Sequence, residues 1–241
     1  MKILHHYNDT HHNTNSAEII IPIIQKFIQP NSVIDVGCGI GQWLKMFHNY
    51  GISDYLGLDG EHVLQDNLMI DKSAFVPTDL SKPKNIKIGK RFDLAISLEV
   101  AEHLPKEVAQ DFVFLLTELS DTIIFSAAIP GQTGENHLNE QWHSYWQDLF
   151  YKRGYSFLDV LRPELWNDER VNWWYRQNIF LVTNQQNLLD VYQSQLFDGR
   201  NCVHPRLLEM HIGIEQDLLT RLKKKSHPLF IKKIINGWNS K

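Results

Sequence analysis

The segment from Glu99 to His103 carries the residue types in this chain best suited to acid–base or metal chemistry. On a helical turn, Glu102 and His103 lie three and four residues beyond Glu99, so all three side chains can share one face. Two carboxylates and an imidazole suit a divalent cation, Mg²⁺ or Mn²⁺ above all, without excluding Zn²⁺ or Fe²⁺. A fourth ligand could come from His137, in the later segment Asn136–Trp142. We therefore predict a metal group of Glu99, Glu102, His103 and His137.

A glycine-rich loop follows the first predicted strand, with the spacing Asp35-x-Gly37-x-Gly39-x-Gly41. Glycines there let the backbone turn sharply and approach a ligand where a Cβ would clash. A dinucleotide-binding loop needs its third small residue one position later, where this chain has Gln42, so the spacing disfavours pyrophosphate. The acid before the loop suits a ligand with a cationic amine instead. The alternative interpretation is an ordinary tight turn between a strand and a helix.

Two further acids follow the next predicted strands. Asp59 ends the second strand, where an acid can accept hydrogen bonds from both hydroxyls of a ribose. Asp79 follows the third strand and is placed to meet the amino group of a base, although a loop-capping aspartate is the alternative.

Together these motifs resemble those of the class I S-adenosylmethionine-dependent methyltransferases, over roughly Ser32 to Thr183. The resemblance implies S-adenosylmethionine as the cofactor. In that family the glycine loop holds the methionine moiety, the second-strand acid holds the ribose and the third-strand Asp-x pair contacts adenine. The predicted cofactor-binding residues are therefore Asp35, Gly37, Gly39, Gly41, Asp59, Gly60, Asp79, Leu80 and Leu98.

The Glu-x-x-Glu-His segment and the later His137 resemble the metal site of the small-RNA 2′-O-methyltransferases, in which the metal polarises a ribose hydroxyl. The ubiquinone-pathway O-methyltransferases share the first of these motifs. Because a sugar hydroxyl is too weak an acid to attack a sulfonium carbon unaided, we predict His103 and His137 as catalytic residues. Gln141 separates Glu140 from Trp142, which departs from the family pattern and leaves the alignment of His137 open by a residue. The alternative is a metal-free site with His103 as general base.

An aromatic segment lies between the last two predicted strands and points to the substrate. Trp and Tyr faces stack on sugar rings, and arginines grip phosphate or carboxylate groups. The run from Trp173 to Arg176, taken as extended chain, is hard to bury whole, although a core under a long insertion is the alternative. The segment resembles one found in bacterial methyltransferases of surface-polysaccharide synthesis. The predicted substrate residues are Arg162, Trp173, Trp174, Tyr175 and Arg176.

Strands that alternate with helical patterns must position these residues, and this alternation predicts an α/β fold. We expect a Rossmann-like, seven-stranded and mostly parallel sheet with helices on both faces, plus a C-terminal helical extension. The predicted strands are 32–36, 55–59, 74–76, 92–98, 122–127, 156–161 and 179–183, and the main helices are 17–28, 41–49, 106–119 and 140–153. We divide the chain into a leader or lid (1–16), a methyltransferase domain (17–185) and a basic helical extension (186–241).

Charge and composition restrict the partners. The net charge is −4, yet the tail from Leu218 holds seven Lys and Arg and no acid, so the body is distinctly acidic. An acidic body disfavours a nucleic-acid substrate. The basic, amphipathic tail suits an anionic membrane surface or a glycan-assembly partner, while packing on its own domain or on a second copy in a homo-oligomer is the alternative. Two cysteines and no apolar signal or membrane span predict a cytoplasmic protein, peripheral at most to the inner face of the membrane.

The predicted function is transfer of a methyl group from S-adenosylmethionine to a carbohydrate hydroxyl, with help from a divalent metal. Metal-independent methylation of a small phenol, amine or phosphorylated alcohol is the second enzyme hypothesis. A silent cofactor-binding scaffold for glycan assembly is a third hypothesis, and a nicotinamide oxidoreductase is disfavoured by the loop spacing.

Overall fold

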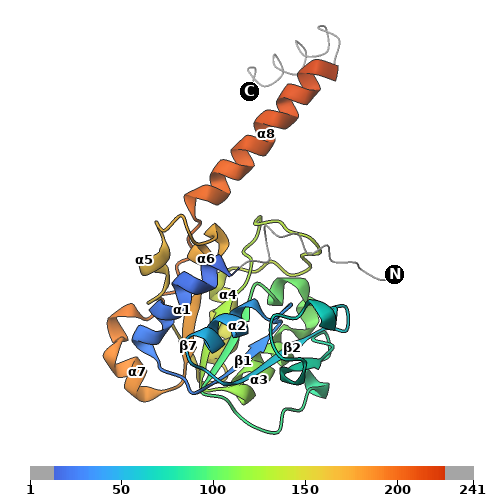
Figure 1. The fold of residues 1–241 in the computed structure, drawn as a ribbon. Coiled ribbons are helices and arrows are strands. Elements are labelled where there is room, and N and C mark those ends of the chain that lie inside the picture. The colour runs from blue at the N-terminus through green and yellow to red at the C-terminus, as the bar shows by residue number, and fades with distance from the viewer. Residues whose placement is uncertain (1–13, 226–241) are drawn as a thin grey trace. The chain divides into compact units, whose positions relative to one another are not determined.

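A computed structural model describes residues 14–225 and centres on one seven-stranded sheet, ordered β3-β2-β1-β4-β5-β7-β6 (Figure 1). All neighbouring strands pair in parallel except β7, which runs antiparallel to both β5 and β6. The expected α/β class with a mostly parallel sheet is confirmed. The strands are β1 (Ser32–Val36), β2 (Asp54–Asp59), β3 (Phe75–Pro77), β4 (Leu94–Leu98), β5 (Thr122–Ser126), β6 (Ser156–Leu158) and β7 (Phe180–Thr183).

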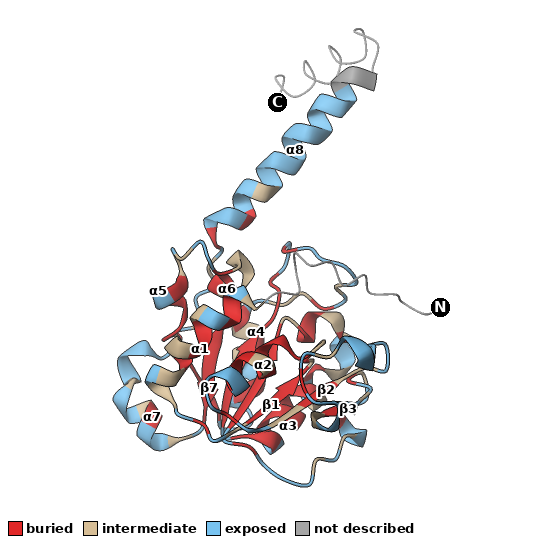
Figure 2. Cartoon of the chain, viewed as in Figure 1, coloured by how far each residue is buried: buried red, intermediate tan, exposed pale blue. Residues whose placement is uncertain are grey.

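Helices cover both faces of this sheet, because its strands send alternate side chains to opposite sides. In β1, Val33 packs with the cluster under α1 and α2, whereas Ile34 packs with the cluster under α3 and α4. The central strands are buried along almost their whole length (Figure 2). The helices of this unit are α1 (Asn15–Phe27), α2 (Gln42–Asn49), α3 (Ala109–Leu119), α4 (His143–Tyr151), α5 (Arg162–Leu165), α6 (Trp173–Asn178) and α7 (Gln186–Val191).

The order of the strands places two of the predicted motifs side by side. Strand β1 pairs with β2 on one side and with β4 on the other. The chain therefore adds strands toward one edge of the sheet up to β3 and toward the other edge from β4 onward. Ligands of open α/β sheets bind at such a switch point, outside the carboxyl ends of the strands. The glycine loop follows β1 and Glu99 follows β4, so both motifs lie at this edge.

Two predicted elements differ from the structure. The run from Trp173 is the helix α6 and not extended chain, and its Arg176, Gln177 and Asn178 are consecutive and all buried. An extended chain would send these neighbours to opposite faces, whereas a helical turn surrounded by polar partners can bury all three. Helix α4 begins only at His143, because the preceding segment is held in an irregular path in which Leu138 and Asn139 donate backbone hydrogen bonds to the Glu102 carbonyl.

The chain divides into two compact units, residues 1–202 and 203–241. In the second unit the described residues form the 21-residue helix α8 (Pro205–Lys225). Residues 1–13, most of the predicted leader, and 226–241, most of the predicted basic tail, lie outside the described residues. Among the described residues, no helix combines the length and the apolar character needed to cross a bilayer.

Candidate functional site

The glycine loop after β1 uses backbone conformations that favour glycine. Gly37, Gly39 and Gly41 have φ values of 91°, 54° and 87°. A Cβ on Gly37 would lie 2.3 Å from a methyl group of Val100, in the segment that follows β4. The loop therefore packs directly against the segment that carries the Glu-x-x-Glu-His motif, and a side chain at Gly37 would separate the two.

Asp59, at the end of β2, is tied to this loop. Its two carboxylate oxygens accept hydrogen bonds from the Gly39 N–H at 2.7 Å and the Gly60 N–H at 2.6 Å. His62 lies 3.6 Å from the same carboxylate, which remains partly exposed. The predicted ribose acid and two of the predicted glycines thus form one connected group.

Asp35 lies beneath the loop, almost completely buried, and its Oδ2 has no hydrogen-bond partner among the described residues. Burial, reinforced by the negative charge of Asp59, raises the pKa of this carboxyl group well above its usual value. A buried carboxylate of this kind is stabilised by a cationic group, which agrees with the predicted amine-bearing ligand.

The predicted adenine residues lie at the end of β3. Leu80 is buried, and Asp79 is half-exposed and accepts hydrogen bonds from Ser81 and Lys82. These donors hold the pKa of Asp79 below its usual value. Leu98, the last residue of β4, is buried beside the loop.

Glu99 does not share a helical turn with Glu102 and His103, which corrects the predicted arrangement. Its backbone is left-handed, with φ of 56°, and the turn that carries the other two begins only at Ala101. Such a conformation is costly for a residue with a side chain and persists only where the surroundings impose it. Here the Glu99 N–H donates to the Ser126 carbonyl at 3.0 Å, and Glu99 is not one of the three residues whose ligand atoms meet, although its charge acts on Glu102.

Two buried amides hold the Glu99 carboxylate instead. Gln132 donates from Nε2 to Oε2 at 2.7 Å, and Asn178 donates from Nδ2 to Oε1 at 3.1 Å. Burial raises the pKa of Glu99, and these donors act in the opposite direction. Gln177 and His143 complete the network behind them.

Glu102, His103 and His137 form a group that could hold a cation, with ligand atoms within 4.8 Å of one another. The imidazole rings of His103 and His137 meet edge to face at 4.9 Å between centroids. Glu102 is completely buried, and neither carboxylate oxygen has a hydrogen-bond donor among the described residues. Burial, then the charge of Glu99, raises its pKa well above the usual value. A buried carboxylate without donors beside two imidazoles fits a divalent cation.

His137 is oriented by Glu140, a residue that the sequence interpretation used only for alignment. Nδ1 of His137 lies 2.8 Å from Glu140 Oε1, which leaves Nε2 for a ligand. Glu140 also accepts hydrogen bonds from the backbone N–H groups of Gly131 and Thr133, both at 2.8 Å. A Cβ on Gly134 would lie only 2.1 Å from His137 Nε2, so this glycine provides the space beside the imidazole.

One aromatic residue of α6 contacts the helix that follows the glycine loop. The ring of Tyr175 meets that of Trp43, in α2, edge to face at 5.4 Å. Burial raises the pKa of the Tyr175 hydroxyl, with further contributions from the charges of Glu99 and Asp35. Trp173 and Trp174 precede Tyr175 as a partly exposed pair, with centroids 5.9 Å apart. The aromatic segment is thus linked through Tyr175 to α2, directly after the glycine loop.

The two predicted substrate arginines are buried. Arg162 makes a bidentate ion pair with Asp159, donates to the Gln177 carbonyl and stacks over Phe180 at 4.1 Å. These contacts give Arg162 a structural role, so it is not part of the proposed substrate site. Arg176 donates to the Trp166 carbonyl at 3.4 Å.

The residues missed from the sequence are Gln132, Asn178 and Glu140. Asn178 lies in the aromatic segment, for which the sequence analysis considered only the aromatic residues and the arginines as site residues. Gln132 follows the carboxyl end of β5, and that position is the one signal that could have identified it.

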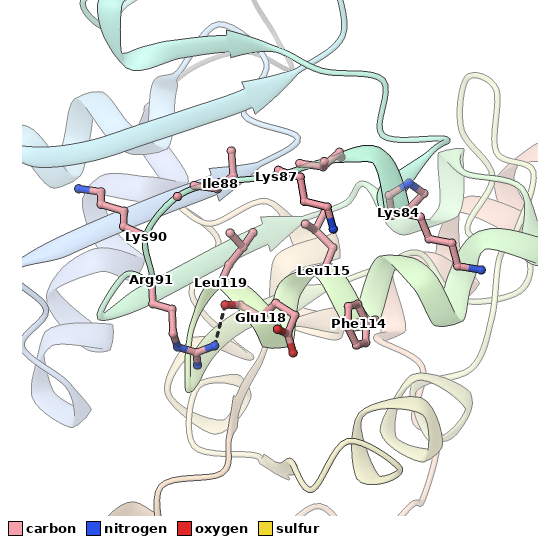
Figure 3. A pocket seen from close by; sticks show the side chains of 12 residues that line it. Lys84, Lys87, Ile88, Lys90, Arg91, Phe114, Leu115, Glu118 and Leu119 are labelled. Carbon is pink, nitrogen blue, oxygen red and sulfur yellow. Dashed lines mark hydrogen bonds between the residues drawn. The ribbon is translucent and has the colours of Figure 1, made fainter.

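A separate groove of about 600 Å³ opens at the opposite edge of the sheet, between α3 and the chain that enters β4 (Figure 3). Basic side chains line it, including Lys84, Lys87 and Arg91. None of the predicted site residues lines this groove, so the candidate site does not include it.

Comparison with known proteins agrees with the fold. Residues 10–160 match the family model described as "Methyltransferase domain", which is more than half of the chain. No curated protein matches the chain. Similar solved structures include the magnesium protoporphyrin IX methyltransferase ChlM from Synechocystis PCC 6803 with bound SAM (18% identity, TM-score 0.51, 73% of this chain and 81% of that chain). DesVI of Streptomyces venezuelae is similar to the same extent, with 14% identity and a TM-score of 0.51 over 73% of this chain and 94% of that chain. The plantazolicin methyltransferase BpumL has 16% identity and a TM-score of 0.51 over 73% of this chain and 87% of that chain. The strand order and the glycine loop at the switch point agree with the family model that matches residues 10–160, and the chain belongs to the methyltransferase-domain family.

Proposed function

We propose that the chain binds S-adenosylmethionine and transfers its methyl group to a carbohydrate hydroxyl, such as that of a glycan precursor, with help from a divalent cation. The buried Asp35 would meet the cationic amine of the cofactor, and the loop backbone would leave room for the methionine chain. Asp59, partly exposed at the end of β2, would take the ribose hydroxyls. The bound SAM of the similar ChlM structure supports this choice of cofactor.

The observation that carries the cation is Glu102, completely buried beside His103 and His137, with no hydrogen bond to either carboxylate oxygen from the part of the chain that the structure describes. A divalent cation there, Mg²⁺ or Mn²⁺ by the ligand types, would polarise a sugar hydroxyl that is otherwise too weak an acid to attack the methyl carbon. Glu102 would supply the charge, and Glu140 would fix the His137 ring with Nε2 directed away from the ion pair.

The partly exposed Trp173 and Trp174 support the carbohydrate class of acceptor, because indole faces stack on sugar rings. The acidic body argues against a nucleic acid as the acceptor. A cytoplasmic location, a membrane or glycan-assembly partner for the basic tail and self-association belong to the same proposal.

Metal-independent methylation of a phenol, amine or phosphorylated alcohol, with His103 as base, is the second candidate. It is favoured by the position of Glu99, which lies outside the group of Glu102, His103 and His137, so that three ligands meet among residues 14–225.

The test measures cofactor binding by calorimetry and methyl transfer to a panel of nucleotide-linked and free sugars, with small phenols and amines alongside. We expect EDTA to abolish transfer to sugars while S-adenosylmethionine still binds, and Mn²⁺ or Mg²⁺ to restore it. Glu102→Gln should behave like the EDTA-treated protein, and the exposed Glu107→Gln should behave like the wild type. Full activity after chelation would favour the second candidate, and absence of cofactor binding would refute both.

A further inference from the structure

Glu99 is held in one place by an amide pair whose orientation the surrounding groups determine. The Asn178 Oδ1 atom accepts hydrogen bonds from Gln177 Nε2 and His143 Nε2, both at 3.1 Å. The Gln132 Oε1 atom accepts from Asn178 Nδ2 at 2.8 Å and from Gln177 Nε2 at 3.2 Å. Both carbonyl oxygens thus have donors, so both NH₂ groups must face the Glu99 carboxylate. A flipped amide would bring a carbonyl oxygen against the carboxylate.

The geometry leaves part of the Glu99 carboxylate available. Gln132 donates to Oε2, Asn178 donates to Oε1 and lies 3.4 Å from Oε2, and the Ser126 hydroxyl is a further partner, so the opening is the exposed part of the carboxylate. Unlike Glu102, Glu99 is partly exposed. The charge of Glu99 acts on the Tyr175 hydroxyl and on Glu102, so Glu99 lies near both the aromatic helix α6 and the cation group.

The two carboxylates of the motif therefore have different surroundings. Glu102 lacks donors and stands with two imidazoles, whereas Glu99 has amide donors and stands outside that group. A cation is best held by carboxylates whose oxygens are free for it, while a hydroxyl or amine hydrogen needs an acceptor fixed in direction.

We propose that Gln132 and Asn178 are positioning residues that direct Glu99 toward the methyl acceptor, so that Glu99 accepts a hydrogen bond from the hydroxyl or amine of the acceptor while the cation is held by Glu102, His103 and His137. This inference rests on the proposed function, because it assigns the acceptor side of the same site. His143 and Gln177 hold these two amides in place through their hydrogen bonds to Asn178 Oδ1 and Gln132 Oε1.

The first experiment separates the two carboxylates by Mn²⁺ calorimetry. Glu102→Gln should lose Mn²⁺ binding, whereas Glu99→Gln should still bind Mn²⁺ with an affinity lowered at most about 10-fold, because only a nearby charge and not a ligand is removed. Equal loss in both variants would overturn the division. If the wild type itself binds no Mn²⁺, the cation part of the proposed function fails, and the kinetic and structural experiments below decide the role of Glu99.

The second experiment measures kcat and KM with the best acceptor from the sugar, phenol and amine panel. Gln132→Ala and Asn178→Ala should lower kcat/KM for the acceptor roughly 10-fold each and Glu99→Gln up to about 100-fold, the range for losing a hydrogen bond to a charged group. Their affinity for S-adenosylmethionine should be unchanged. Gln147→Ala is the matched control, because Gln147 is a partly buried amide that donates to the Phe197 carbonyl outside this network. Wild-type acceptor kinetics in both amide variants would overturn the proposal.

The third experiment needs neither metal nor acceptor. In a crystal structure of Asn178→Ala with S-adenosylhomocysteine, the Glu99 carboxylate should leave its position beside Gln132. A carboxylate that keeps its position with one amide removed would refute the positioning role, whatever the cofactor and cation experiments show.

Discussion

The buried His143 makes the stability of this protein depend on pH in a predictable direction. It is 2% exposed, bonds to Asn178 and packs against Phe180 with 5.2 Å between ring centroids. Burial, then the positive charge of Arg162, lowers its pKa from 6.5 to about 4. The folded protein therefore binds a proton at His143 less readily than the unfolded chain does. This contribution to stability is fully present above about pH 6.5 and is lost as the pH falls toward 4.

The magnitude follows from linkage. A shift from 6.5 to about 4, at about 1.4 kcal/mol per pKa unit, sets a limit of about 3.4 kcal/mol at pH values below both pKa values. Between about pH 7 and pH 5, the loss from this one group is about 2 kcal/mol.

The assay compares urea unfolding of the wild type and of His143→Gln at these two pH values. A glutamine can keep a donor toward Asn178 but does not titrate, so its stability should fall by about 2 kcal/mol less than that of the wild type. The difference between the two proteins cancels the titration of every other group they share. An equal fall in both proteins, within about 0.5 kcal/mol, would show that His143 is charged in the folded state and would refute the reasoning.

Three further predictions concern the site. Gly37→Ala should abolish S-adenosylmethionine binding in calorimetry, because its Cβ would lie 2.3 Å from Val100 at a φ of 91°; Gly89→Ala, whose Cβ meets nothing within 4 Å, is the control and should bind normally. Asp59→Ala should weaken the cofactor about 100-fold through two lost charged hydrogen bonds, and unchanged affinity would remove the ribose assignment. Gly134→Ala should displace the His137 ring and lower Mn²⁺ affinity at least about 10-fold while S-adenosylmethionine binds as before; intact Mn²⁺ binding would exclude His137 as a ligand.

The sequence was informative where a local pattern has one physical solution. A short β-branched run followed by closely spaced glycines requires a strand and a sharp turn, and β1 with its loop follows that prediction. The sequence was less informative where partners come from distant parts of the chain. Glu99 adopts a left-handed conformation because Ser126, Gln132 and Asn178 hold it, and none of these is close in sequence.

The same limit explains the arginines and the aromatic helix. Arg162 resembles an anion-binding residue in the sequence, but two groups that hold it in the interior, the Gln177 carbonyl of α6 and the Phe180 ring of β7, come from later elements of the chain. The run from Trp173 to Arg176 was predicted as extended chain with aromatic side chains on both faces. Its helical conformation buries Gln177 and Asn178 in a polar network with Gln132, a partner far away in the sequence.

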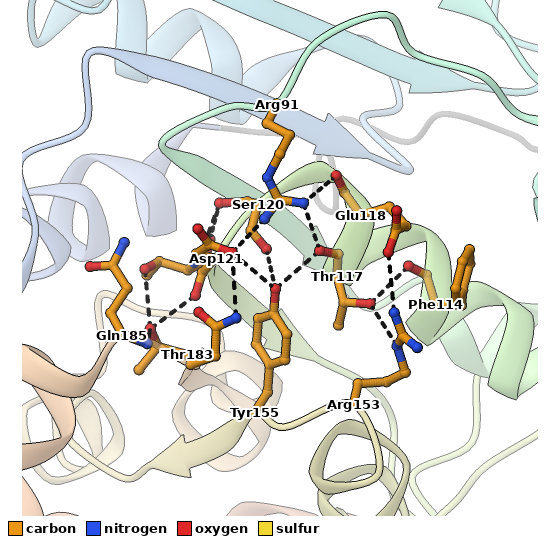
Figure 4. A network of polar contacts seen from close by, with 12 residues as sticks. Arg91, Phe114, Thr117, Glu118, Ser120, Asp121, Arg153, Tyr155, Thr183 and Gln185 are labelled. Carbon is orange, nitrogen blue, oxygen red and sulfur yellow. Dashed lines mark hydrogen bonds and ion pairs between the residues drawn. The ribbon is translucent and has the colours of Figure 1, made fainter.

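A polar network at the amino-terminal ends of the strands, opposite the candidate site, has a consequence for engineering (Figure 4). The Tyr155 hydroxyl donates to the Ser120 carbonyl at 2.8 Å and lies 3.0 Å from the Thr117 carbonyl, while Arg91 pairs with Asp121. These contacts join the end of α3 to the starts of β4, β5 and β6, away from every residue assigned to chemistry. Loops at the carboxyl edge could therefore be exchanged to change the acceptor while the opposite edge keeps the strands in register, so the scaffold and its specificity are separable parts.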